Sequence, residues 1–347
     1  MMEEILENRR ISLLTRNFEK PPHRLNSLHE SDAELVDMGD SSAYYLAATA
    51  DALIEEVESG LYDDPNFIGW MLATANFSDL AAVGADPLGL LVTVSYASAQ
   101  DETYLPRLAA GIHEACRALG TFVLGGDTNQ GEHLSLAGCA LGLVPRDEVV
   151  TRVGARPGDR IYLTGPAGLG AVYAFLRLGG QVAASASSFF KPMARINEGR
   201  LVRRFASCAM DTSDGLIHAL DTLMRLNRCH FAIEDRWTEI LHPLVIKVCQ
   251  AQGIPPWLAL AAVHGEFEVC FTVRPSREQA FLTAARTAGW FPIAVGRVAE
   301  GEGVSIQANG KCVLLDTTLI RNIAAEAGAD PKAYIGKLFK IAQEVGV

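Results

Sequence analysis

The stretch Asn76-Phe-Ser-Asp-Leu-Ala-Ala-Val-Gly-Ala-Asp-Pro87 sets one carboxylate, Asp79, between polar residues and a short apolar helical face. Asn76 or Ser78 can accept hydrogen bonds from free backbone N–H groups, and the helix dipole favours an acid in the first turn. The stretch therefore predicts a capped helix start, within a helical pattern that covers residues 67–85. Such a start would hold the acid at a defined place in the fold.

Three further acidic stretches are similar, because each follows an apolar, strand-like run and precedes a turn or a helix. Hard cations bind oxygen ligands, and small neighbouring residues leave room for phosphate groups. A single aspartate at a helix start is more often a cap than a metal ligand, but five such acids favour a magnesium–polyphosphate site. The three stretches are Thr49-Ala50-Asp51, Gly125-Gly126-Asp127-Thr128 and Met210-Asp211-Thr-Ser213-Asp214-Gly215.

The composition is that of an ordinary globular protein, with 49% hydrophobic and 20% charged residues. A length of 347 residues is enough for two domains, each with a sizeable core. The formal net charge of -11, without a segregated basic patch, argues against nucleic acid as a partner. The same charge is compatible with ATP, because bound magnesium ions invert the local sign.

The seven cysteines stand singly, without any Cys-x-x-Cys pair. This pattern predicts reduced, mostly buried thiols rather than a zinc site or a disulfide framework. The N-terminus is charged and lacks the apolar run of a signal peptide, and no apolar run is long enough to span a bilayer. We therefore expect a cytoplasmic protein without a membrane partner.

Strand and helix patterns alternate along the first half of the chain, which predicts an α+β sheet domain. Buried strands are expected at 88–97 and 134–144, and a helix at 102–119. A short strand at 121–124 is expected to end in the Gly-Gly-Asp turn. The predicted units are an N-terminal arm at 1–37, a sheet domain at 38–152, a sheet-and-helix domain at 153–316 and a helical C-terminal extension at 317–347.

Other phosphate and nucleophile motifs are missing. There is no Gly-x-x-x-x-Gly-Lys-Ser/Thr loop, and the glycines of residues 165–170 do not have the spacing of a dinucleotide-binding turn. No Gly-x-Ser-x-Gly elbow is present. His218 follows the Asp-Gly helix start and is placed to approach a ligand, although a histidine that packs in a helix is the more common case.

The ordered motifs resemble thiamine-monophosphate kinase, a family in the superfamily of aminoimidazole ribonucleotide synthetase (PurM-like). The resemblance covers residues 38 to 300 and implies a dimer of two-domain α/β subunits, in which the N-terminal sheet domain makes the dimer contact. It also implies ATP, several magnesium ions and transfer of the γ-phosphoryl group to a small phosphate monoester. The motifs are Gly39-Asp-Ser-Ser-Ala43, Thr49-Ala-Asp51, Asn76 to Ala85, Gly125-Gly-Asp-Thr128, Thr151-Arg-Val-Gly-Ala-Arg-Pro-Gly-Asp159 and Met210 to Leu216.

The resemblance assigns a role to each matching residue. It implies catalytic roles for Asp79, Asp214 and Arg152. It implies nucleotide contacts from Gly126, Asp127, Arg152 and Ser213. The implied metal ligands are Asp40, Thr49, Asp51, Asp79, Asp127, Asp211 and Asp214, and Glu266 is the implied substrate residue.

The chain departs from the family pattern on the acceptor side. The family's Gly-Asp-Asp is Gly39-Asp40-Ser41 here, so one carboxylate is missing, and a hydroxyl residue is replaced by Ala50. The acceptor motif Gly-Gly-Glu-Asp-Tyr-Glu corresponds to residues 263–268, in which Gly265 replaces the glutamate unless a gap realigns Glu266. The aromatic C-terminal ending of the family is replaced by the helical extension.

Three functions therefore stay open at this point. The chain is a thiamine-monophosphate kinase, or a related phosphotransferase that acts on another phosphorylated aromatic cofactor precursor, or a nucleotide-binding regulator without catalysis. The loss of an acid at Ser41 favours the regulator slightly, whereas the retained acids of the other motifs count against it.

Overall fold

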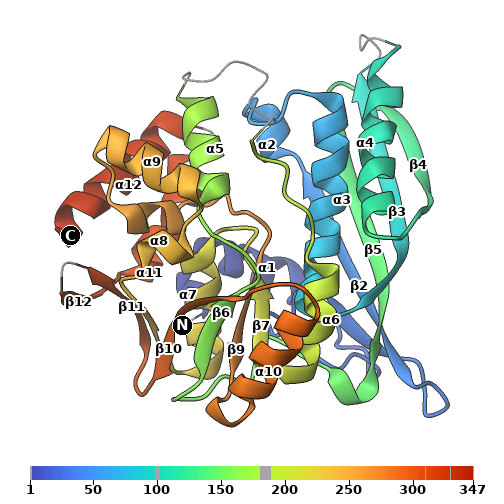
Figure 1. Cartoon of the computed structure of the whole chain (residues 1–347). Helices are drawn as coiled ribbons and strands as arrows, with labels where there is room; N and C mark the ends of the chain where they lie inside the picture. Colours follow the sequence, from blue (N-terminus) through green and yellow to red (C-terminus); the bar gives the residue numbers. More distant parts are fainter. Residues whose placement is uncertain (1, 98–101, 180–188, 309, 329, 347) are drawn as a thin grey trace.

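The computed structural model describes residues 2–97, 102–179, 189–308, 310–328 and 330–346. Two mixed β-sheets, one from each half of the chain, form the frame of the molecule (Figure 1). Helices cover these sheets, so the architecture is the predicted α+β class. No helix in the described part of the chain is both long and apolar enough to cross a membrane.

The first sheet has five strands in the order β1-β2-β5-β3-β4. Only β3 and β4 run parallel, and every other neighbouring pair is antiparallel. The edge strand β1 lies within the range expected as an arm. The strands are β1 (Glu34–Asp37), β2 (Tyr44–Leu53), β3 (Asp86–Ala97), β4 (Val123–Gly131) and β5 (Ser135–Pro145), and the helices of this half are α2 (Glu55–Glu58), α3 (Pro65–Ala82) and α4 (Tyr104–Ala118).

Helix α3 is the central element, because it packs against both sheets. It begins at Asp64, whose side chain accepts a hydrogen bond from the backbone N–H of Phe67 at 3.0 Å, with Pro65 in the first turn. A helix between two sheets has no face to solvent, and nearly all its side chains are buried. The predicted capped start at Asn76 is wrong, because that residue lies in the last turns of α3 and uses its side chain for tertiary contacts.

The second helix of this half, α4, packs closely along α3. Two glycines permit the approach, because a Cβ atom on Gly69 would lie 2.1 Å from the carbonyl oxygen of Leu108. A Cβ atom on Gly111 would lie 1.8 Å from the carbonyl oxygen of Asn66. The helix predicted at residues 102–119 is confirmed by α4.

Two predictions for the strands of this half have different outcomes. The strand predicted at 88–97 is confirmed by β3. The turn predicted at Gly125-Gly126-Asp127 is wrong, because β4 continues through these residues in parallel register with β3. The pairing with the long strand β3 extends the short predicted strand across both glycines.

The second sheet has seven strands in the order β12-β11-β8-β10-β6-β9-β7. Its strands are β6 (Arg160–Leu163), β7 (Ala206–Asp211), β8 (His230–Ile233), β9 (Val269–Val273), β10 (Ile293–Ala299), β11 (Gly303–Ala308) and β12 (Lys311–Leu314). Its helices are α5 (Leu169–Leu178), α6 (Ile196–Phe205), α7 (Leu216–Asn227), α8 (Trp237–Ile240), α9 (Pro243–Gln252) and α10 (Pro275–Thr287). The stretch 179–190 is rich in Gly, Ala and Ser, which predicts a surface loop, and its residues 180–188 lie outside the described part of the chain.

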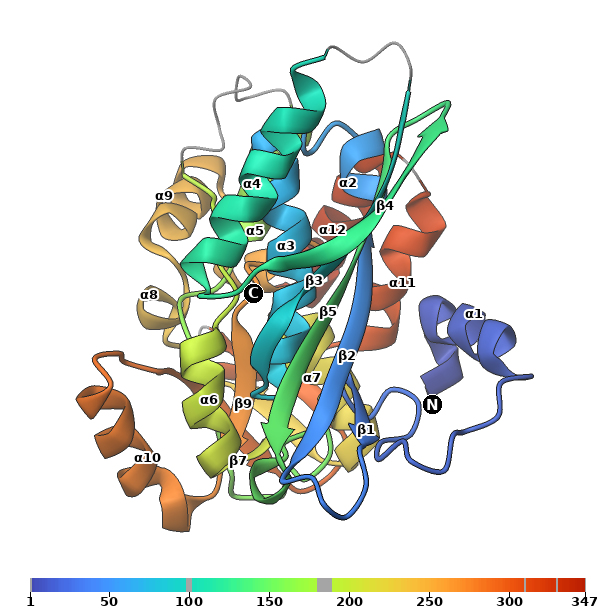
Figure 2. The ribbon, with the colours of Figure 1, turned by 90° about the vertical axis from the view of Figure 1, so that its right-hand side faces the viewer.

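The two ends of the chain meet. Helix α1 (Leu6–Thr15) follows a short 3-10 turn and lies beside α11 (Thr317–Ala327), as Figure 2 shows. The last helix, α12 (Pro331–Val345), begins at Asp330, whose side chain accepts from the backbone N–H of Lys332 at 2.9 Å. The C-terminal extension has a helical pattern that the Asp330-Pro331 pair is predicted to interrupt, and both features are confirmed by α11 and α12.

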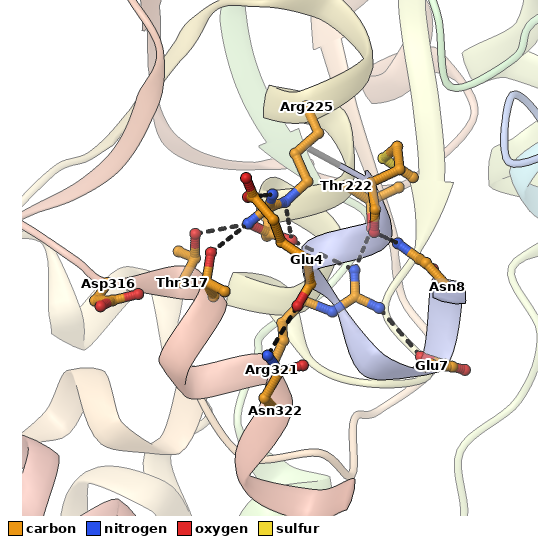
Figure 3. Close-up of polar contacts among 12 residues, drawn as sticks. Glu4, Glu7, Asn8, Thr222, Arg225, Asp316, Thr317, Arg321 and Asn322 are labelled. Atoms are coloured by element: carbon orange, nitrogen blue, oxygen red, sulfur yellow. Dashed lines mark hydrogen bonds and ion pairs between the residues drawn. The ribbon is translucent and has the colours of Figure 1, made fainter. Parts of the chain in front are cut away.

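A terminal ion cluster holds these ends together. It is defined by Glu4, Glu7, Arg225 and Arg321, which Figure 3 shows, together with Asp221. The buried carboxylate of Asp221 accepts from Arg225 at 2.9 Å and lies 3.5 Å from Arg321. The two arginines also pair with Glu4 at 2.9 Å and with Glu7 at 3.2 Å. The cluster thus joins the N-terminal segment, α7 and α11.

The outer face of the first sheet, which points away from α3, is mainly apolar. Along β5 the inward residues are buried, whereas the alternate residues Leu141 and Leu143 are only partly buried. Leu91 on β3 is 39% exposed. Adjacent positions in the register place Ala50 and Asp127 on this same face.

Candidate active site

Three acidic side chains from distant parts of the sequence converge where the two sheets meet α3. Oxygen atoms of Asp32, Asp79 and Asp211 all lie within 4.8 Å of one another. Asp32 precedes β1, Asp79 lies on α3 and Asp211 ends β7. The arrangement therefore draws one acid from each of three elements.

The sequence Asn76-Phe-Ser-Asp79 of α3 organises this cluster. Asn76 accepts from the backbone N–H of Asp51 at 3.1 Å and donates to its carbonyl at 3.3 Å, which fixes β2 against the helix. Ser78 donates to the carboxylate of Asp211 at 2.8 Å. Asp79 itself accepts a hydrogen bond from Thr49 on β2. Asn76 and Asp79 thus hold β2, and Ser78 holds the end of β7.

Burial and mutual repulsion raise the pKa values of Asp51, Asp79 and Asp211. Burial, with the charges of Asp51 and Asp211, holds the pKa of Asp79 well above its usual range. Burial and the charge of Asp32 raise the pKa of Asp211 to about 7. Burial likewise raises the pKa of Asp51. Without a cation, protons are the counter-charge that this cluster takes up.

One arginine offsets part of the negative charge. Arg152 contacts the fully buried side chain of Asp32 at 2.8 Å. The other carboxylate oxygen of Asp32, Oδ2, is buried and has no hydrogen-bond partner among the described residues. A buried oxygen without a partner is costly in free energy. Because the clustered ligand atoms are carboxylate oxygens, the residues fit a divalent cation such as magnesium.

The turn after β7 carries the next two predicted residues. Ser213 donates to the carboxylate of Asp211 at 3.0 Å. Asp214 lines a cavity of about 860 Å³, and burial raises its pKa to about 7. Gly215 begins α7 with φ +84°, and a Cβ atom there would lie 2.5 Å from the carbonyl oxygen of Ala262. This glycine lets the acidic turn lie close to the loop before β9.

The cavity has a charged end and an apolar end. Asp214 and Glu56 lie at the charged end, and their carboxylates repel each other. His218, one turn after Asp214 on α7, is also in the wall. Burial lowers the pKa of His218 to about 3, so this side chain is neutral at pH 7. The rest of the lining includes further charged residues of α1, α2 and α11, and apolar residues of α5, α12 and the segment between α9 and β9.

The structure does not bring every predicted residue to the cluster. Asp40 is exposed in the turn between β1 and β2. Gly126 shares a row of the sheet with Asp51 through Gly138 and Val92, so three strand spacings, about 14 Å, separate the two backbones. Asp127 is exposed, and its carboxylate accepts from Asn129 at 2.9 Å.

Glu266 is buried rather than on a cavity wall. Its carboxylate accepts from the backbone N–H of Gly168 at 2.7 Å and from the hydroxyl of Thr212 at 3.4 Å. Burial raises its pKa to about 8. In this structure Glu266 ties the loop before β9 to the turn before α5, and it does not line the described cavity.

Sequence reasoning missed Asp32, which supplies one of the three carboxylates of the cluster. Its neighbours Ala33 and Leu35 are buried at 1% and 0% exposure, and this alternation is the pattern of a strand. The signal that would have found Asp32 is an acidic residue directly before a short strand. That strand, β1, pairs with β2, which carries Asp51.

Comparison with known proteins places this chain in a family. The model of the AIR synthase related protein N-terminal domain matches residues 30–144, and that of the C-terminal domain matches residues 156–309. A thiamine-monophosphate kinase of Pyrococcus horikoshii is 30% identical over 285 residues, which cover 81% of this chain and 86% of that protein. The Escherichia coli enzyme of the same name is 31% identical over 264 residues, 73% and 79% of the two chains.

Solved structures agree with this placement. The structure of AaThiL complexed with AMPPCP and TMP has a TM-score of 0.72 at 24% identity, with 90% of this chain and 95% of that chain covered. The HypE–HypF complex, at 17% identity and a TM-score of 0.71, shares the fold. The chain therefore belongs to the AIR synthase related (PurM-like) family and is a phosphotransferase of the thiamine-monophosphate kinase type.

Proposed function

We propose that this chain uses ATP and magnesium to phosphorylate a small phosphate monoester, with thiamine monophosphate as the acceptor to test first. The observation that carries the proposal is the buried cluster of Asp32, Asp79 and Asp211, with the unpartnered Oδ2 of Asp32. A buried group of carboxylates is stabilised by divalent cations, and phosphoryl transfer requires such cations on the triphosphate.

We assign the magnesium ligands to this cluster and its neighbours. Magnesium held by these residues would neutralise the charge of the triphosphate, so the protein would need no nucleophile of its own. Arg152 holds Asp32 by an ion pair and adds a fixed positive charge at the edge of the cluster. The ligands would be Asp32, Thr49, Asp51, Asp79, Asp211 and Asp214, with Asp32 in the role that the resemblance gives to Asp40.

We place the acceptor in the cavity beside Asp214. It adjoins the acidic turn that holds Asp211, and its volume of about 860 Å³ is in the range of small-molecule sites. The related AaThiL structure holds AMPPCP and TMP, which supports a nucleotide and a phosphate ester side by side. Ser213, on the same turn, would contact the nucleotide. Glu266 supports this turn through Thr212 rather than by contact with substrate.

We further propose a homodimer formed through the outer face of the first sheet. The apolar residues Leu91, Leu141 and Leu143 leave this face incompletely covered in a single chain. Asp127 lies on the same face, away from the carboxylate cluster of its own chain. A second subunit on this face would bring Asp127 and the backbone of Gly126 toward a site that both chains complete.

Calorimetric titration with a non-hydrolysable ATP analogue, with and without magnesium, tests the nucleotide half of this proposal. Turnover of ATP with thiamine monophosphate then tests the acceptor half. Magnesium-dependent binding with turnover supports the kinase. Binding without turnover would favour another phosphorylated precursor or a regulator, and an absence of binding would refute the assignment of the carboxylate cluster.

A further inference from the structure

The C-terminal helix α12 lies beyond the residues that the two family models match, which end at residue 309. It nevertheless forms part of the cavity beside Asp214. Its residues Tyr334, Leu338 and Phe339 are in the cavity wall. A segment beyond the matched family domains thus shapes the place where the acceptor of the proposed function would lie.

Tyr334 links this helix to the acceptor side of the site. Its hydroxyl oxygen accepts a hydrogen bond from the backbone N–H of Val263 at 2.8 Å. Val263 opens the stretch that corresponds to the family's acceptor motif, and the loop that contains it also lines the cavity. Asp214 and Tyr334 line the same cavity, and burial, with a contribution from the charge of Asp214, raises the pKa of Tyr334. The ring of Tyr334 is therefore held beside the acidic turn.

Phe339 belongs to the apolar part of the cavity lining. Its ring meets that of Phe175 on α5 edge to face, with ring centroids 6.4 Å apart. Leu178 on α5 and Leu338 on α12 extend the same wall. Aromatic and aliphatic walls of this kind bind a flat apolar ring, and they offer few partners to a strongly hydrated group.

We propose that α12 is the wall that determines acceptor specificity: the acceptor's ring packs against Phe339 and Tyr334, and its phosphate lies toward Asp214. This inference rests on the proposed function, because it assumes that the cavity receives the acceptor. Tyr334 acts here as a positioning residue, and Phe339 sets the size and the apolar character of the body that fits. The acceptor class is a phosphate monoester that carries an aromatic ring.

The test uses the full chain with magnesium, ATP and two probes, thiamine monophosphate and the bulkier 2-naphthyl phosphate. Phe339→Ala should raise KM for thiamine monophosphate about tenfold, which corresponds to about 1.4 kcal/mol of lost contact, and leave KM for ATP within about twofold. The same variant should favour 2-naphthyl phosphate relative to the wild type. Tyr334→Phe, which keeps the ring and removes the bond to Val263, should lower kcat more than it changes KM. Lys340→Ala, an exposed change on the same helix, is the matched control.

A merely structural role for α12 predicts a different result, in which Phe339→Ala lowers the melting temperature and affects both probes and ATP equally. Either that result or an unchanged KM for thiamine monophosphate would overturn the inference while the kinase function stands. Calorimetric binding of thiamine monophosphate beside the ATP analogue separates the remaining cases. If the wild type binds but does not turn over, and Phe339→Ala weakens binding, the inference stands and the proposed reaction fails. If the wild type does not bind thiamine monophosphate, both are refuted for this acceptor.

Discussion

Ser78 on α3 donates a hydrogen bond of 2.8 Å to Asp211 at the end of β7, and both side chains are buried. This bond joins the helix of the first half to the sheet of the second. Ser78→Ala should lower the free energy of unfolding by about 1–3 kcal/mol, because a buried carboxylate loses a donor. Urea unfolding of the magnesium-free protein measures the loss. A stability equal to that of the wild type would contradict the structural role of this bond.

Asp32 and Asp40 provide a matched pair of acids for the metal site. Asp32→Asn should abolish magnesium-dependent binding of an ATP analogue, because it removes one of the three clustered carboxylates. Asp40→Asn should leave binding unchanged, since Asp40 is exposed in a turn. Calorimetry with each variant distinguishes the two. The assignment fails if Asp40→Asn is the variant that loses the metal.

Asp79→Asn should likewise remove magnesium-dependent binding of the ATP analogue and leave the fold intact. The amide relieves repulsion from the neighbouring acids, so the metal-free variant should be at least as stable as the wild type. Calorimetry and thermal unfolding measure the two effects. Unchanged affinity for magnesium–ATP would refute the role of Asp79 as a ligand.

The raised pKa of Asp211 predicts how metal-free stability depends on pH. Its folded pKa of about 7 lies above the ordinary value of 3.8, so the folded state binds more protons and this group destabilises the protein as pH rises from 4 to 7. Asp211→Asn removes this term and should gain stability over the wild type across that range, by a few kcal/mol at pH 7. Unfolding in EDTA at several pH values gives the difference. A constant difference across the range would contradict the prediction.

Removal of the buried charge at Asp221 should loosen both ends of the chain. Asp221→Asn leaves Arg225 and Arg321 without their shared carboxylate and should cost about 3–5 kcal/mol of stability. Lys337→Ala, which breaks the exposed pair with Glu326, should change stability by less than about 1 kcal/mol. Urea unfolding of the two variants gives the comparison. Equal effects would argue against the terminal ion cluster.

Leu91→Asp tests the proposed dimer. A charge on the apolar outer face of the first sheet should convert a dimer into a monomer, because the buried carboxylate would lack a partner. Sedimentation at several concentrations reports the oligomeric state. A wild type that is monomeric at every concentration would refute the proposed interface.

Strong local patterns were predictive of the fold. The β-branched run of β3, the apolar face of α4 and the Asp330-Pro331 break before α12 each have a local cause, and the structure confirms them. The extended conformation of Gly125-Gly126 was not predictable, because it depends on pairing with β3, a contact between distant residues.

The site was only partly predictable for a similar reason. Asp79 and Asp211 stand out in the sequence, and the structure brings them together. Asp32 has no local feature beyond a short alternation, and its role depends on the position of β1 at the edge of the sheet. The family pattern led to Asp40, which is close in sequence but exposed in the turn.

The terminal ion cluster also orders events during protein synthesis. Helix α1 is synthesised well before its partners Arg321 and Asn322, because 316 positions separate Leu6 from Asn322 in the sequence. This helix therefore docks only after α11 has been synthesised, and the cavity wall that contains Glu7 and Arg321 is completed only then.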